Sequence, residues 1–131
     1  MKYEPHFREV SKYEPAFLNR GSFPAYRGSV TIEKGQVLKK GSILGRKTAS
    51  GKYVLCAKTA EDGTTAIADG SEKARCILQL DIDATEADKF APVFRTGAFL
   101  RLDLTVGKSH TLDSVQDELE LHNIYLENGE D

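Results

Sequence analysis

Few residues of this chain have the types and spacing that catalysis requires. Catalysis needs a nucleophile with its base, a pair of carboxylates, or a metal cluster whose members can converge. The three histidines, His6, His110 and His122, are scattered along the sequence. Asp81 and Asp83 alternate and would share one face of a strand, a pattern more typical of a solvated face than of a divalent-cation site. We therefore predict no enzyme activity, no metal site and no cofactor.

The cysteines and the glycine-rich turns are expected to be structural. Cys56 and Cys76 each lie in an apolar run, and in a reducing cytoplasm we expect both to be buried free thiols. Residues 41–45 lack the lysine and the following helix of a phosphate-binding loop, so we expect a pair of turns there. Asp62 and Gly63 predict a hairpin turn, with residues 64–68 as the return strand.

The most distinctive pattern is a repeat near the N-terminus. Residues 2–7 read Lys-Tyr-Glu-Pro-His-Phe, and residues 12–17 read Lys-Tyr-Glu-Pro-Ala-Phe. An extended backbone places alternate side chains on one side, whereas proline interrupts a helix and the spacing gives it no apolar stripe. A tether without a binding role is the alternative, but the second copy favours a strand-like arm that binds a partner protein. The side chains expected to enter the partner are Tyr3, Pro5, Phe7, Tyr13, Pro15 and Phe17.

Composition divides the 131 residues into an extended arm, residues 1–29, and one β-rich domain, residues 30–131, which we call the body. The arm carries five Lys or Arg and three Glu, whereas the body carries thirteen basic and seventeen acidic residues. After Lys108 there are seven acidic residues and no Lys or Arg, which disfavours nucleic acid and anionic membranes as partners. The chain has no apolar segment of about 18 residues and no signal-peptide core, so we expect synthesis in the cytoplasm.

From Val30 onward, short apolar segments alternate with glycine-containing turns, the pattern of an all-β domain. The alternation over residues 98–106 predicts a strand with Leu102 on the core face. The alternation over residues 77–83 predicts another, with Leu80 on the core face. Further strands are expected at residues 43–44, 53–57 and 93–95.

One short helix is expected near the C-terminus. Apolar residues recur at helical spacing from Leu112 to Leu119, and Asp113 with Gln116 has the spacing of a capping box. Asn123 can end the helix in the left-handed conformation, and the next three residues then predict a last short strand. The fold class is therefore mainly β with one short C-terminal helix, a compact domain preceded by an extended N-terminal arm.

Several segments of the body follow, in order, the turns and strands of a known family. They are residues 38–45, 51–53, 62–63, 76–78, 81–84, 97–99 and 123–126. On these segments, over about residues 32–126, the chain resembles the phage lambda head decoration protein D family. The resemblance implies a β-clip-like fold. The doubled repeat and the acidic C-terminal tail depart from the family pattern.

The resemblance also implies a function. The working unit would be a homotrimer that binds the major capsid protein at threefold and quasi-threefold sites of the expanded capsid. On the outer surface of the virion it would stabilise the head against the pressure of packaged DNA. The protein would be made in the host cytoplasm, with no small-molecule substrate, and its arm would become ordered on the capsid.

Two other interpretations remain open. Residues 37–44 also look like the hammerhead strands of biotinyl or lipoyl carrier domains, in which a turn lysine bears the cofactor. A carrier domain, or another small β binding module, is therefore the second interpretation. It is disfavoured because no lysine here occupies a two-residue hairpin between methionines or acidic residues. An enzyme of unrecognised type is the third, and a pocket that collects perturbed titratable residues would indicate it.

Overall fold

The computed structural model describes residues 25–128. These residues form a mainly β domain with one α-helix near the C-terminal end, as the sequence predicts. The elements in chain order are β1 (Arg27–Ile32), β2 (Val37–Leu38), β3 (Ile43–Arg46), β4 (Tyr53–Leu55), β5 (Cys76–Leu78), β6 (Ile82–Asp83), β7 (Lys89–Phe94), β8 (Gly97–Leu100), a 3-10 turn η1 (Arg101–Asp103), α2 (Leu112–Leu121) and β9 (Ile124–Glu127).

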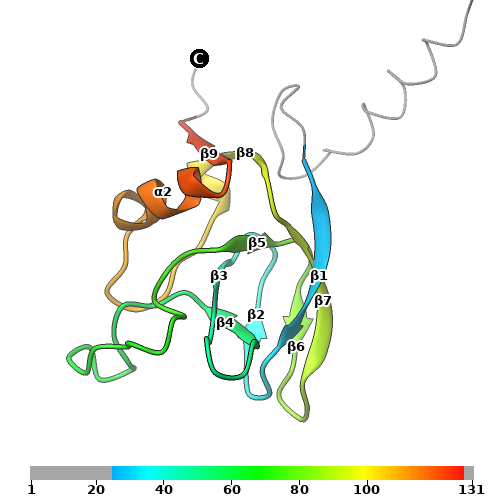
Figure 1. Cartoon of the computed structure of the whole chain (residues 1–131), viewed down its shortest axis with the longest axis vertical. Helices are drawn as coiled ribbons and strands as arrows, with labels where there is room; N and C mark the ends of the chain where they lie inside the picture. The colour runs from blue at the N-terminus through cyan, green and yellow to red at the C-terminus, as the bar shows by residue number, and fades with distance from the viewer. Residues whose placement is uncertain (1–24, 129–131) are drawn as a thin grey trace, which may run out of the picture.

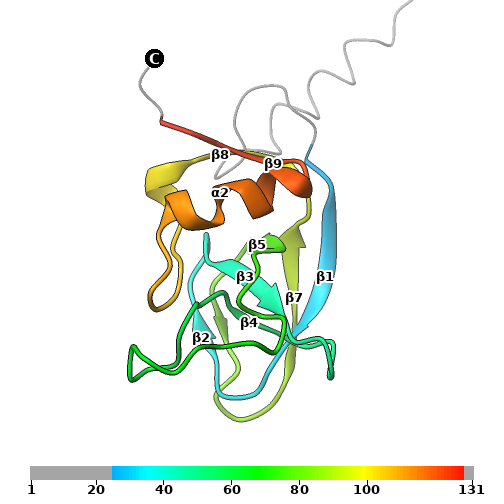
Figure 2. The ribbon, with the colours of Figure 1, turned by 60° about the vertical axis from the view of Figure 1, so that its left-hand side comes forward.

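Strands β1, β4, β3, β5 and β7 form a closed barrel, in that order around the sheet. β1 and β7 make the longest pairing, antiparallel from Arg27 opposite Phe94 to Ile32 opposite Lys89. Two short sheets complete the fold, antiparallel β2 with β6 and parallel β8 with β9. Figures 1 and 2 show that β8, β9 and α2 lie together at one end of the barrel.

The barrel wall lies between two apolar clusters. The inner cluster draws buried side chains from all of the barrel strands, and the outer cluster joins the wall to α2, β8 and β9. In β5, Cys76 and Leu78 belong to the inner cluster and Ile77 belongs to the outer one. All three residues of β5 are therefore buried. A strand that is covered on both faces in this way has a continuous apolar sequence rather than an alternating one.

The strand predicted over residues 98–106 is wrong beyond Leu100, where β8 ends and the turn Arg101–Asp103 begins. Leu102 is 79% exposed, so it does not face the core as the alternation predicted. The reason lies in the neighbouring strand. β9 pairs with β8 only as far as Glu127 opposite Leu100, so the hydrogen-bonded ladder that would extend the strand stops there.

The strand predicted over residues 77–83 divides into two. β5 ends at Leu78, and the chain then leaves the barrel to pair Ile82 and Asp83 with β2. Leu80 lies in the connection and is 53% exposed, so its predicted place in the core is also wrong. Apolar and polar residues continue to alternate along this segment, but its first part belongs to the barrel and its last part to the two-stranded sheet of β2 and β6.

Helix α2 confirms the predicted helix, with a different cap. The N-cap is Thr111, whose side chain accepts from the backbone N–H of Ser114, while the Ser114 hydroxyl accepts from the backbone N–H of Thr111. The predicted capping box of Asp113 and Gln116 is therefore wrong, because the box forms two residues earlier. Asn123 takes the left-handed conformation, as predicted, with φ of 63°. Within residues 25–128, no helix has the length and apolar character to cross a membrane.

The predicted hairpin turn is present, but its return strand is not. The carboxylate of Asp62 accepts hydrogen bonds from the side chain and backbone of Thr65 and from the backbone of Thr64, which lower the pKa of Asp62 to about 2. Gly63 takes a positive φ of 76°. Beyond the turn, the pairing shrinks to one isolated bridge between Thr59 and Ala66.

The burial pattern gives a first prediction. Leu102→Asp should change the free energy of unfolding by no more than about 0.5 kcal/mol, because the side chain is already in water. Phe99→Ala should cost about 3–5 kcal/mol, because Phe99 is fully buried against the ring of Phe94. Urea unfolding of both variants is the measurement. Equal losses would show that the exposed turn after β8 is misplaced.

Candidate functional site

The side chains predicted to bind a partner, Tyr3, Pro5, Phe7, Tyr13, Pro15 and Phe17, lie outside the described residues, as does His6. What the structure describes is the point where the arm joins the body. Ala25 packs against the outer cluster. The backbone N–H of Tyr26 donates to the Thr96 hydroxyl at 3.0 Å, and the backbone N–H of Arg95 donates to the Tyr26 carbonyl at 2.7 Å. β1 then begins at Arg27, before the expected start of the body at Val30.

Both ends of the described segment lie at the same end of the molecule. Figures 1 and 2 show the start of β1 and the end of β9 on the side that carries β8 and α2. Tyr26, at the start, is 65% exposed there. The described chain therefore enters β1 at the end of the body that carries α2, β8 and β9.

The two described histidines, His110 and His122, lie at opposite ends of α2. His110 Nε2 lies 2.8 Å from the Glu72 carbonyl oxygen, and because a carbonyl only accepts, this nitrogen carries the proton. Its Nδ1 lies 2.7 Å from the Ser114 hydroxyl, so the ring ties the start of α2 to the loop before β5. His122 lies apart, at the C-terminal end of α2. Within residues 25–128, no three His, Cys, Asp or Glu side chains are grouped to hold a metal.

Asp81 and Asp83 are used to hold turns. Asp81 accepts from the backbone N–H of Lys40 at 2.8 Å. Asp83 accepts from the hydroxyl and the backbone N–H of Thr85, and these hydrogen bonds lower the pKa of Asp83. Asp81 therefore joins two segments that are distant in the sequence, whereas Asp83 holds its own turn. The two residues do not share a strand face, because Asp81 precedes β6.

Both cysteines are buried free thiols, as predicted. Burial raises the pKa of Cys56 to about 12 and that of Cys76 to about 12. Cys56 also donates a weak hydrogen bond to the Glu72 carbonyl, 3.4 Å away. A thiol held protonated in this way is a poor nucleophile.

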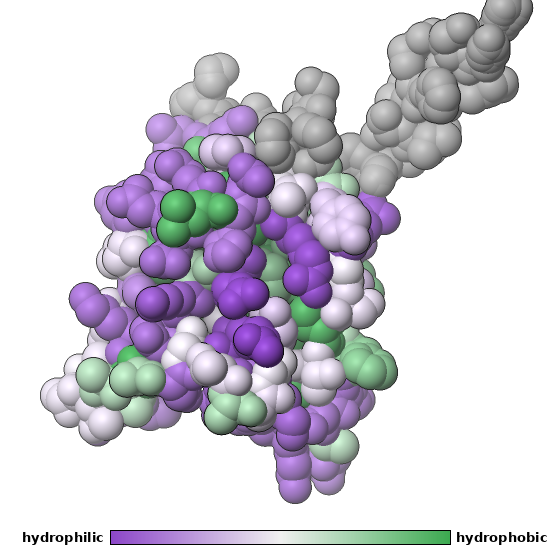
Figure 3. Space-filling view, in the orientation of Figure 1, coloured by the Kyte–Doolittle hydropathy of each residue, from purple (hydrophilic) through white to green (hydrophobic). Residues whose placement is uncertain are grey.

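A polar pocket of about 310 Å³ lies between the end of β3, the loop before β5 and α2. Its lining residues are Arg46, Thr48, Ala68, Gly70, Glu72, Lys73, Arg75, Glu118 and His122. Figure 3 shows strongly hydrophilic side chains in the middle of this face, below α2. We call this site the cationic pocket, because three of its side chains are basic.

The loop that carries two of these cations is fixed closely against the barrel. A Cβ on Gly45 would lie 2.0 Å from the Ser71 carbonyl oxygen, so only glycine at this position of β3 allows the loop to approach. Gly70 takes a positive φ of 103°, and its N–H donates to the Glu72 carboxylate at 2.9 Å. The loop backbone is therefore held in place before any ligand arrives.

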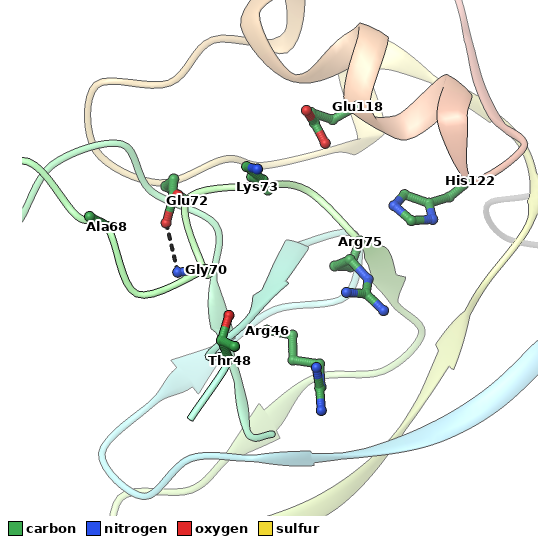
Figure 4. Close-up of a pocket in the computed structure, with 9 residues that line it drawn as sticks. All are labelled: Arg46, Thr48, Ala68, Gly70, Glu72, Lys73, Arg75, Glu118 and His122. Atoms are coloured by element: carbon green, nitrogen blue, oxygen red, sulfur yellow. Dashed lines mark hydrogen bonds between the residues drawn. The ribbon is translucent and has the colours of Figure 1, made fainter. Parts of the chain in front are cut away.

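The three cations of the pocket have no anionic partner among the described residues. Arg46, Lys73 and Arg75 form none of the ion pairs or side-chain hydrogen bonds found there. In Figure 4, Arg46 and Arg75 lie on the side of the pocket away from Glu118. Guanidinium groups in this arrangement bind carboxylates or phosphates, and no nucleophile is hydrogen-bonded to a base in the pocket.

Sequence reasoning did not identify the cationic pocket. Arg46 is distant from Lys73 and Arg75 in the chain, and only the fold brings them together. The available signal was the alternation of Lys73 and Arg75 around buried Ala74 within a net acidic body. That signal predicts two basic side chains on one exposed edge, but no pocket.

In a comparison with known protein families, the family model for bacteriophage lambda head decoration protein D matches residues 11–121. The matched region contains the second copy of the N-terminal repeat and the body from β1 to the end of α2. No curated protein matches the chain.

The buried thiols give a second prediction. Cys56 and Cys76 should react slowly with an aromatic disulfide reagent at about pH 8 in the native protein and rapidly in denaturant, since the thiolate is the reactive form. Unfolded thiols lose their protons above the ordinary pKa of 9.0, whereas the folded ones keep theirs to about 12. The unfolded state then binds fewer protons, so the free energy of unfolding should fall as pH rises from 9 toward 12. Rapid native labelling would contradict the burial of both thiols.

Proposed function

The chain belongs to the bacteriophage lambda head decoration protein D family, and we propose that it binds the capsid as a homotrimer held by its N-terminal arms. The protein decorates the phage head. In the proposal, trimers sit on the outer surface at threefold and quasi-threefold sites and contact the major capsid protein. They join neighbouring capsid subunits and resist the outward pressure of packaged DNA. The observation that carries the proposal is the family match over residues 11–121.

The way the chain enters the body supports an attachment that carries force. A pull on the arm would act first on Ala25 and Tyr26, which are held by the outer cluster and by residues 95–96, and then on β1. β1 pairs with β7 along its whole length and with β4 at Ile32. A force along β1 therefore loads many backbone hydrogen bonds at once, so the barrel resists extraction of the strand.

A trimer multiplies the effect of a weak arm. Three arms on one trimer convert the second and third attachments into intramolecular events, governed by effective concentration rather than by protein concentration. Fully extended, the 24 residues before Ala25 would span up to about 80 Å, so in the proposal each arm extends beyond its own body to a neighbouring capsid subunit. The carrier-domain interpretation has no structural observation in its favour.

A truncation tests the arm. Removal of residues 1–24 should leave the fold and the number of chains in the oligomer unchanged and should greatly weaken binding to capsids. The cut must precede Ala25, because removal of residues 1–28 would also delete the first residues of β1. The measurement is co-sedimentation with expanded heads that lack their own decoration protein, beside light scattering of the free protein. Full binding by the truncated protein would refute the role of the arm.

Substitutions within the arm separate side-chain recognition from simple tethering. Replacement of Tyr3, Phe7, Tyr13 and Phe17 by serine should weaken binding nearly as much as the truncation, because aromatic side chains supply most of the area that an extended segment can bury. The matched control replaces Glu4 and Glu14 by glutamine, which keeps the backbone and should change binding little. Equal effects of the two sets would show that the glutamate charges contribute as much as apolar burial, which would contradict the predicted role of the aromatic side chains.

A further inference from the structure

The cationic pocket holds charges that the described part of the chain does not neutralise. Arg46 ends β3, Arg75 precedes β5, and their guanidinium groups lie together in Figure 4. Glu72 is engaged by the backbone of Gly70, and Glu118 lies across the pocket beside Lys73. The Arg46 and Arg75 side therefore remains open to an external carboxylate.

A complementary surface lies on α2. Asp113, Asp117 and Glu120 follow one another at spacings of four and three residues, so they share one face of the helix, which we call the acidic stripe. All three residues are exposed. Like charges at these spacings repel, and in the described residues only Asp113 has a cationic partner, Arg101 at 2.7 Å.

The acidic stripe and the cationic pocket face different directions. At about 100° per residue, Glu118, which lines the pocket, lies about 100° around the helix from Asp117 and about 160° from Glu120. Two complementary but different patches on separate sides of one chain produce a head-to-tail contact, which closes into a ring when the rotation permits. A second copy of the chain can therefore offer its stripe to the pocket of the first.

We propose that Arg46 and Arg75 receive the carboxylates of Asp117 and Glu120 from the next copy of the chain, and that this contact helps to close the ring. The inference rests on the homotrimer of the proposed function. The pocket lies on the flank of the body, below α2 (Figure 4), whereas β1 begins at the end that carries β8 and β9 (Figure 1). A flank position suits a neighbouring copy better than the capsid surface that the arm reaches. Arginine is well suited to this role, since its planar fork pairs bidentately with carboxylates.

Charge reversal with rescue tests the contact. R46E/R75E should raise the dissociation constant of the oligomer at least about tenfold, because each interface then opposes like charges. D117R/E120R should do the same. The quadruple variant R46E/R75E/D117R/E120R restores opposite charges at every interface and should recover most of the lost affinity. Sedimentation equilibrium over a concentration series measures the mass, and thermal unfolding checks that each variant folds.

The controls separate this contact from a general effect of charge. K39E/K58E makes the same change in net charge at exposed residues outside the pocket and should leave the oligomer intact. R46Q/R75Q should weaken association less than R46E/R75E does, and it serves if the reversal fails to fold.

Three results would overturn the inference. An intact R46E/R75E trimer would show that the pocket does not bind a second copy, and poor capsid binding by that trimer would identify the capsid as its occupant. Failure of the quadruple variant to recover would exclude the acidic stripe as the partner. A monomeric wild-type protein would instead refute the homotrimer itself, and the contact with it.

Discussion

The burial of β5 on both faces is the constraint on which the rest of the fold depends. Cys76 and Leu78 pack inside the barrel, whereas Ile77 packs beneath α2. The three consecutive residues of this short strand therefore connect the inner and outer clusters. A closed barrel of short strands has little room for additional core inside it. The second layer, built from α2, β8 and β9, buries the outer face of the same wall and supplies apolar area that the barrel alone lacks.

The sequence could predict the elements whose signals are local. α2 and β9 were predicted because apolar residues recur at helical spacing and because Asn123 takes the left-handed conformation between them. The core positions of Leu80 and Leu102 were wrong because alternation reports the two sides of a strand but not where a ladder ends. Each of the two residues lies two positions beyond the last paired residue of its strand, which is Leu78 in β5 and Leu100 in β8. The neighbouring strand, β7 or β9, sets where that pairing ends.

The two candidate sites also differ in how local their signals are. The binding arm could be predicted from the sequence, and stays a prediction, because a repeat is a local pattern whose side chains need only an extended backbone to lie on one side. The cationic pocket was not visible, because it needs Gly45 to bring the loop before β5 against β3, and α2 to form the opposite wall. A close approach of two backbones depends on the absence of a side chain, and a glycine in a strand does not show which segment will approach it.

The two surfaces place different demands on the same barrel. An arm attached through β1 transmits force along a strand, so it benefits from a long ladder with β7 and from a rigid junction at Tyr26. A charge contact at the flank resists lateral separation of copies, and its strength depends on how completely the arginines lose water when a carboxylate enters. In the two proposals, attachment to a shell and association of copies are separable, because the first site is at an end of the barrel and the second is on its side. There the net negative charge of the body opposes the approach of free copies at long range, while the opposite charges of the pocket and the acidic stripe select one register at contact.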